Sequence, residues 1–195
     1  MDIGYKITFH SFWHCGSGLA SGADADLLVI KDKDGLPFVP GKTIKGLVKE
    51  AVDLLHPCFE GYIDVFGEEG KTRSMSFFSD ATLPKDEHQY LSHDDNKHLS
   101  KFLYQNISGT TITDGGVADG NTLRKIQVCV PCVLEGKILN VPDKKPDKEN
   151  SKAVAISDLL VDGLRYIKRL GAWRNRGLGR CTIEIIEPEQ KGGES

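Results

Sequence analysis

This chain has few cysteines and no long apolar run, and both facts limit the class of protein to which it can belong. Five cysteines are spread through 195 residues, with no signal peptide ahead of them. This usage indicates free thiols in a reducing cytoplasm rather than a disulfide framework. No apolar run approaches the roughly 20 residues that a membrane-spanning helix needs. We therefore expect a cytoplasmic protein with no membrane partner.

An excess of positive charge is missing as well. The chain has 25 Lys and Arg against 28 Asp and Glu, which gives a formal net charge of -3. Overall charge therefore does not indicate nucleic-acid binding, which has to be judged from where the basic residues lie. No internal repeat is found, and 39% hydrophobic content suits one domain with a real core over residues 1–195.

Positive charge is concentrated in one segment, residues 165–180. The segment holds six basic residues and no acid, and it contains three glycines from Gly171 onward. Glycines let the backbone approach a polyanion closely, and arginines supply planar, bidentate donors for phosphate. The sequence therefore predicts a phosphate-binding loop whose cationic side chains are Arg169, Arg174, Arg176 and Arg180.

Hydrophobic periodicity predicts a mixed α and β chain. Alternating or short apolar runs predict strands over residues 3–12, 26–31, 75–78, 128–139 and 180–186. Helical spacing predicts helices over residues 44–55 and 158–169. The polar, Gly- and Thr-rich stretch 84–120 predicts an extended excursion from the core, and residues 141–152 a solvated, mobile loop.

Gly41, Lys42 and Thr43 look like the end of a nucleotide P-loop. Five residues separate Gly35 from Gly41, however, where that motif has four. Two prolines within the stretch would also remove N–H donors from the cradle. ATP or GTP binding is therefore disfavoured.

The same residues suit a nucleic-acid backbone better. A helix N-terminus with free amides, carrying Thr43 and flanked by Lys42, Lys45 and Lys49, can hold a backbone phosphate. The alternative is a solvated lysine face.

Cys129 and Cys132 have the spacing of half a zinc site. No second close pair accompanies them, and two residues three apart on a strand point to opposite faces. Ordinary core thiols are therefore favoured.

Histidines supply two further candidate sites. His10 and His14 could be the acid and base of a ribonuclease, although a hydrogen-bonding or base-stacking role for His14 is favoured. A metal cluster is also conceivable within the polar stretch, although a solvated loop is favoured there. Its members would be His88, His93, His98, Asp94 and Asp95.

Several motifs in order resemble the RAMP superfamily of CRISPR-associated proteins, in particular the Cas7-type backbone subunits of type III effector complexes. Residues 8–18 and 26–46 resemble the family's opening, and 65–67 with 77–81 resemble its next segment. Residues 120–124 resemble the stretch closing its thumb, and 169–180 its glycine-rich loop.

The resemblance implies an α+β fold: a ferredoxin-like or RRM core with an inserted β-hairpin thumb at residues 84–120 and a C-terminal glycine-rich loop. It implies binding of CRISPR RNA and target RNA, in which Arg124 would join the basic residues above. It also implies head-to-tail stacking on further Cas7-like copies, and Cas10-, Cas5- and Cas11-like partners.

In the cleaving members of the family, an aspartate in the loop between the first two strands supports metal-dependent cleavage of target RNA. Asp26 is the best match, as catalytic residue and as ligand for Mg²⁺ or another divalent cation, and Asp24 is the second candidate. Three alternatives stay open: a non-catalytic guide-binding scaffold, a non-CRISPR RRM protein, and a Cas6-like endoribonuclease. The last would process guide RNA without metal, through His14 or His10.

Overall fold

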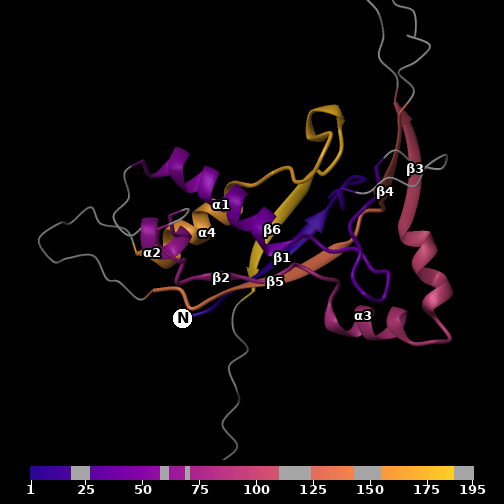
Figure 1. Cartoon of the computed structure of the whole chain (residues 1–195), viewed down its shortest axis with the longest axis horizontal. Helices are drawn as coiled ribbons and strands as arrows, with labels where there is room; N and C mark the ends of the chain where they lie inside the picture. The colour runs from indigo at the N-terminus through magenta and orange to yellow at the C-terminus, as the bar shows by residue number, and fades with distance from the viewer. Residues whose placement is uncertain (19–26, 58–61, 69–70, 110–123, 143–154, 187–195) are drawn as a thin grey trace, which may run out of the picture.

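A four-stranded antiparallel sheet forms the centre of the computed structural model (Figure 1). Its strands are β1 (Ile3–Phe9), β2 (Phe77–Phe78), β5 (Val133–Leu139) and β6 (Cys181–Ile186), in the order β2-β5-β1-β6. The structure describes residues 1–18, 27–57, 62–68, 71–109, 124–142 and 155–186. Among these residues, none of the helices combines the length and the apolar character that a bilayer crossing requires.

Helices α1 (Gly41–Leu55) and α4 (Ile156–Tyr166) pack together on one side of the sheet, with the short α2 (Tyr62–Phe66) nearby (Figure 1). Both long helices bury one apolar stripe and expose the other face. They approach closely at Gly163, where a Cβ would lie 3.1 Å from Val52 Cγ2. The core therefore lies between these helices and the inward side chains of β1 and β5.

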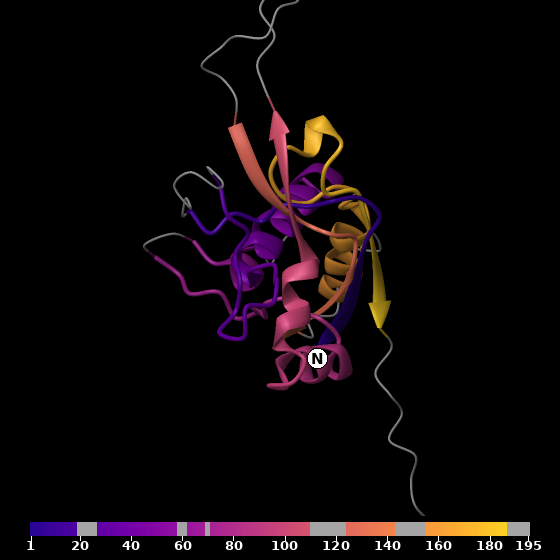
Figure 2. The same ribbon diagram turned by 90° about the vertical axis from the view of Figure 1, so that its right-hand side faces the viewer.

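A second sheet of two strands stands beside the first. Strands β3 (Tyr104–Gly109) and β4 (Arg124–Cys129) pair in antiparallel fashion, with Gly109 opposite Arg124. We call this pair the ribbon. Helix α3 (Lys85–Ser92) and a 3₁₀ helix (Lys97–Leu103) lead into it. Figure 2 shows the ribbon rising beside the loop that precedes β6.

Two strand predictions need correction. Residues 128–139 form parts of two strands in different sheets, because the chain bends at Pro131, which has no N–H for a ladder. Residues 27–31 form only isolated bridges, since Val29 pairs locally with Gly16 and Lys31 with Pro37. Residue 26 lies outside the described residues.

Other predicted elements differ in extent or kind. The first strand ends at Phe9 rather than residue 12, and the second helix runs from Ile156 to Tyr166. The closing strand is confirmed at Cys181–Ile186. The stretch 84–120, predicted as an excursion from the core, begins with helices, and α3 buries none of its residues. Most of the predicted mobile loop and residues 110–120 lie outside the described residues.

Gly136 makes room for the Tyr5 ring on the buried face of the sheet. The two residues are directly paired between β1 and β5, and Tyr5 is fully buried. A Cβ on Gly136 would collide with the Tyr5 hydroxyl, and it would lie 2.5 Å from the ring atom Cζ. Glycine is therefore needed here for packing.

We predict that Gly136→Ala lowers the free energy of unfolding by about 1–3 kcal/mol, the usual cost of overpacking a core. Gly4→Ala is the matched control, because its Cβ would meet its nearest neighbour, Ile186 Cβ, at 3.4 Å. Urea unfolding of the two variants measures the difference, and equal stabilities would contradict this packing.

Candidate nucleic-acid interface

Residues 169–180, which we call the arginine loop, dock onto the chain that follows β1. The N–H of Ala172 donates to the carbonyl oxygen of His14 at 2.8 Å, and the N–H of Gly179 donates to that of Phe12 at 2.8 Å. The loop is therefore held by its backbone, and these two hydrogen bonds use none of its arginine side chains.

Two glycines permit this docking. Gly171 has φ +98°, and a Cβ there would collide with the carbonyl oxygen of His14. Gly179 has φ +70°, and a Cβ there would collide with the carbonyl oxygen of Leu170. Both positions therefore need a residue without a side chain.

The predicted arginines of the loop all project outward. Arg169, Arg174, Arg176 and Arg180 are exposed, and none forms an ion pair with a carboxylate within the described part of the chain. The Arg169 guanidinium donates to the carbonyl oxygen of Arg174, which stiffens the loop. Because guanidinium groups without internal acids are available to phosphates, the loop can bind a polyanion.

Arg124 lies on the neighbouring ribbon and is also exposed. It is paired with Gly109, whose Cα faces the ring of Trp173: a Cβ on Gly109 would lie 2.9 Å from Trp173 Cη2. The structure therefore brings Arg124 beside the arginine loop, although 45 residues separate it from Arg169 in the sequence.

The three lysines of α1 form a second basic surface. Lys42, Lys45 and Lys49 lie on one side of the helix, at the edge of a hollow of about 370 Å³ that Phe66 and Thr72 also line. Burial lowers the pKa of Lys45, and the neighbouring Lys49 lowers it further. Mutual repulsion of this kind favours an anionic ligand.

The amides at the start of α1 are mostly occupied, contrary to our expectation. The N–H of Gly41 donates to Asp80 Oδ1 at 2.8 Å, and that of Thr43 donates to the carbonyl oxygen of Pro40 at 2.8 Å. The Thr43 side chain is hydrogen-bonded to Cys15, whose pKa burial raises. Any phosphate contact at this helix therefore falls to the lysine side chains.

His14 supports the interface from inside. Its ring is 1% exposed, and its Nδ1–H donates to the carbonyl oxygen of Gln127 at 2.7 Å. Of the two roles favoured for His14, hydrogen bonding is the one that the structure shows, because a side chain this buried has no ring face open for a base. Burial lowers its pKa. His10 is exposed, but its Nε2 is hydrogen-bonded to Thr182 Oγ1 at 2.8 Å.

Asp24 and Asp26 lie outside the described residues. The chain on either side of them is described, and it is held together: the N–H of Ser17 donates to the carbonyl oxygen of Leu28 at 3.0 Å. The N–H of Gln127 donates to that of Leu27 at 2.9 Å. The residue that follows Asp26 is therefore bound to the ribbon.

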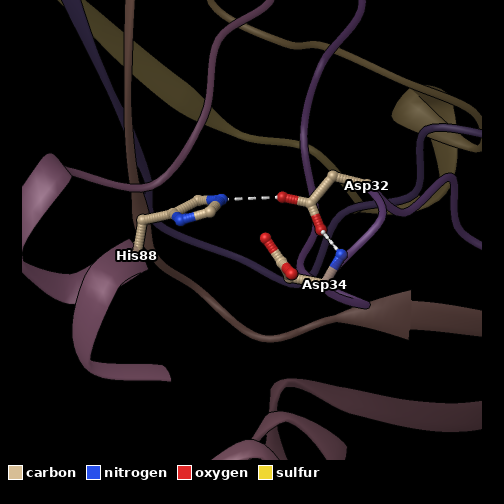
Figure 3. Close-up of side chains that lie close together, drawn as sticks. All are labelled: Asp32, Asp34 and His88. Atoms are coloured by element: carbon tan, nitrogen blue, oxygen red, sulfur yellow. Dashed lines mark hydrogen bonds and ion pairs between the residues drawn. The ribbon is translucent and has the colours of Figure 1, made fainter. Parts of the chain in front are cut away.

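Asp32, Asp34 and His88 could supply ligands to a cation, since one ligand atom from each lies within 4.8 Å of the others (Figure 3). Two carboxylates and an imidazole suit a divalent metal. Both oxygens of Asp32 are already engaged, however. Oδ2 lies 2.8 Å from His88 Nε2, and Oδ1 accepts the N–H groups of Asp34 and Leu36 at 2.9 Å. We therefore assign this trio the structural task of joining α3 to the loop after Lys31.

The metal cluster considered from the sequence is not formed by the residues named there. His93 Nδ1 lies 3.6 Å from Asp95 Oδ2, and Asp94 is paired with Lys97 at 2.8 Å. His88 faces Asp32 instead, because α3 turns it toward that loop.

Cys129 and Cys132 do not point to opposite faces, because the strand is broken at Pro131 and their thiols are hydrogen-bonded to each other. The bond to Cys132 and burial raise the pKa of Cys129. No third ligand joins them within the described ranges, which agrees with core thiols.

The sequence analysis missed Asp80 and Trp173, and it named His88 with partners other than the one the structure shows. Asp80 caps α1 from the loop after β2, His88 reaches Asp32, and Trp173 joins the arginine loop to the ribbon. Only the resemblance of residues 77–81 to a segment of the family gave any signal for Asp80. The other two depend on contacts between distant segments.

The buried imidazole predicts a pH dependence of stability. The folded-state pKa of His14 lies below its unfolded value of about 6.5, so its contribution is full above that pH and is lost as the pH falls below it. Urea unfolding at about pH 7.5 and about pH 5.5, which bracket that value, should show a smaller loss on acidification for His14→Gln than for the wild type. Equal losses would contradict a neutral, buried His14.

Comparison with known proteins places this geometry in a family. Two chains of type III-B Cmr-beta complexes solved by cryo-EM have a similar fold. The chain from the complex bound to cognate target RNA is 13% identical, with 95% of this chain and 97% of that chain covered and a TM-score of 0.70. The apo one is 15% identical, with 96% and 98% covered and a TM-score of 0.67.

A search of curated proteins found no match. The sequence profile of the RAMP superfamily matches residues 6–182, which is most of the chain. The resemblance found in the sequence motifs is thereby confirmed, and this protein belongs to the RAMP superfamily.

Proposed function

We propose that this chain is a guide-RNA-binding backbone subunit of a type III CRISPR effector complex. One observation carries the proposal: the exposed arginines of the arginine loop, free of internal carboxylates among the described residues, stand beside the ribbon in a chain of the RAMP superfamily. Contacts of this kind grip a phosphate backbone without reading its bases, as a subunit that accepts any guide requires.

The fold that this function implies is a ferredoxin-like core with a thumb. The element order β1-α1-β2-β5-α4-β6, with strands in the order β2-β5-β1-β6, supports the core. The insertion of α3 and the ribbon between β2 and β5 supports a thumb that includes residues 84–120 and continues through β4. The proposed partners are CRISPR RNA, target RNA, further Cas7-like copies, and Cas10-, Cas5- and Cas11-like subunits. The target-bound type III-B chain above supports this choice.

We also propose that the chain cleaves guide-paired target RNA through Asp26. The residue after it, Leu27, is bonded to Gln127 on the ribbon, which is where the proposed RNA path runs. A carboxylate is the oxygen ligand that Mg²⁺ prefers, and the ion would supply charge stabilisation for attack by the adjacent 2′-hydroxyl. Asp26 would hold that ion or orient the hydroxyl.

A metal-independent, Cas6-like reaction at His14 has less support. Its ring is buried and its Nδ1–H is committed to Gln127, so it offers no exposed acid or base.

Our first functional prediction concerns the phosphate contacts. Replacing Arg174, Arg176 and Arg180 by Ala should weaken RNA binding, and should lower the slope of log affinity against log salt by about two, since each lost contact removes about 0.7. Fluorescence polarisation over a salt series measures both.

The matched control removes the same charge elsewhere. Lys6, Lys71 and Lys97 are each paired with a carboxylate, at 3.0, 2.7 and 2.8 Å. Their triple replacement by Ala should leave the slope nearly unchanged. If both triple variants lose affinity equally, the arginine loop acts only through overall charge.

Our second functional prediction concerns cleavage. Asp26→Asn in every copy of the subunit should slow Mg²⁺-dependent cleavage of a complementary target RNA by about 100-fold or more, the usual effect of losing a positioned acid–base or ligand group. Guide and target binding should remain, because the carboxylate acts on the reacting group.

Asp24→Asn is the control and should have much less effect on the cleavage rate. An essential Asp24 would move the site by two positions. A wild-type complex that binds target and never cuts it would make the subunit a scaffold.

A further inference from the structure

Trp173 has an unusual backbone conformation within the arginine loop. Its φ is +55°, and among the described residues only Asn140 is another non-glycine residue with positive φ. A bulky side chain rarely adopts the left-handed region, so surrounding contacts have to hold it there.

Those contacts come from the ribbon, from Phe12 and from Leu178 of the arginine loop itself. Trp173 packs against a small apolar cluster, separate from the main core, that contains Ile107, Ile126, Val128, Phe12 and Leu178. Its ring lies over the last residue of β3, Gly109, where a Cβ would meet Cη2 at 2.9 Å and Cζ3 at 3.2 Å. Any larger residue at 109 would displace the indole.

The indole also contacts an arginine. The guanidinium carbon of Arg176 lies 5.2 Å from the centre of the ring. The backbone N–H of Arg176 donates to the backbone carbonyl oxygen of Trp173 at 2.7 Å. A guanidinium at this distance from an aromatic face is attracted to it, which limits where the side chain points.

We propose that Trp173 is a positioning residue. It fixes the arginine loop to the ribbon, so that Arg176 and the Arg124 opposite Gly109 contact one stretch of RNA backbone together. This inference rests on the proposed RNA-binding function and adds to it a specific joint between two basic surfaces that are distant in the sequence.

The physical advantage is preorganisation. Two cationic groups held at a fixed spacing bind successive phosphates without the entropic cost of ordering a free loop. If the joint is loosened, the charges remain but are no longer placed together, so fewer phosphates are contacted at once.

Gly109→Ala tests the joint, because it adds one methyl group against the indole and changes no charge. We expect RNA affinity to fall about tenfold, and the salt slope to fall by about one contact, roughly 0.7. Gly4→Ala is the control, since it adds the same group to a strand with only a 3.4 Å contact. Trp173→Phe, which keeps a smaller aromatic ring, should retain more of the wild-type RNA affinity than Trp173→Ala.

Tryptophan fluorescence reports the contact itself, and its response to RNA is a readout that a purely structural role would not move. Trp13 is fully buried and serves as the constant component, so the difference spectrum against Trp173→Phe isolates Trp173. In Gly109→Ala the Trp173 emission should shift to the red, and RNA should change it less than in the wild type.

The outcomes separate the two claims. Wild-type binding of RNA, with Gly109→Ala unchanged in emission and slope, would overturn the positioning role and leave the proposed function standing. A wild-type chain that binds no RNA would overturn the function and the inference that rests on it.

Discussion

Residues 12–14, shortly after β1, are the constraint on which the rest of the interface depends. Trp13 exchanges backbone hydrogen bonds with Cys129 at 3.1 and 2.8 Å, and its indole N–H donates to the carbonyl oxygen of Val130 at 3.1 Å. On the other side, the carbonyl oxygens of Phe12 and His14 accept the N–H groups of the arginine loop. One short extended segment thus ties together the ribbon and the loop.

This arrangement explains why so much of the segment is buried. Trp13 and His14 are 0% and 1% exposed, and His14 is uncharged there because burial lowers its pKa. A buried hydrogen bond is costly to leave unmade, so the ring of His14 and the carbonyl of Gln127 hold each other in place. The interior supplies rigidity, and the arginines outside supply charge.

The same division holds at α1. Asp80 satisfies the first amide of the helix, so that end of the helix serves the fold. Its lysines, spaced along one face, remain as the part that can meet an anion. A net charge of -3 does not exclude an anion-binding surface, because the arginines of the arginine loop form no ion pair with a carboxylate among the described residues.

The sequence by itself determined the local features. Three features could be predicted because each depends on neighbours in the chain. They are the helical periodicity of α1, the alternation of β6, and the density of arginine and glycine in residues 169–180. Tertiary structure decided that His14 is internal, that residues 128–139 divide between two sheets, and that Trp173 meets Gly109. Burial and pairing depend on contacts between segments tens of residues apart, and no local pattern records which distant backbone will arrive at a given side chain.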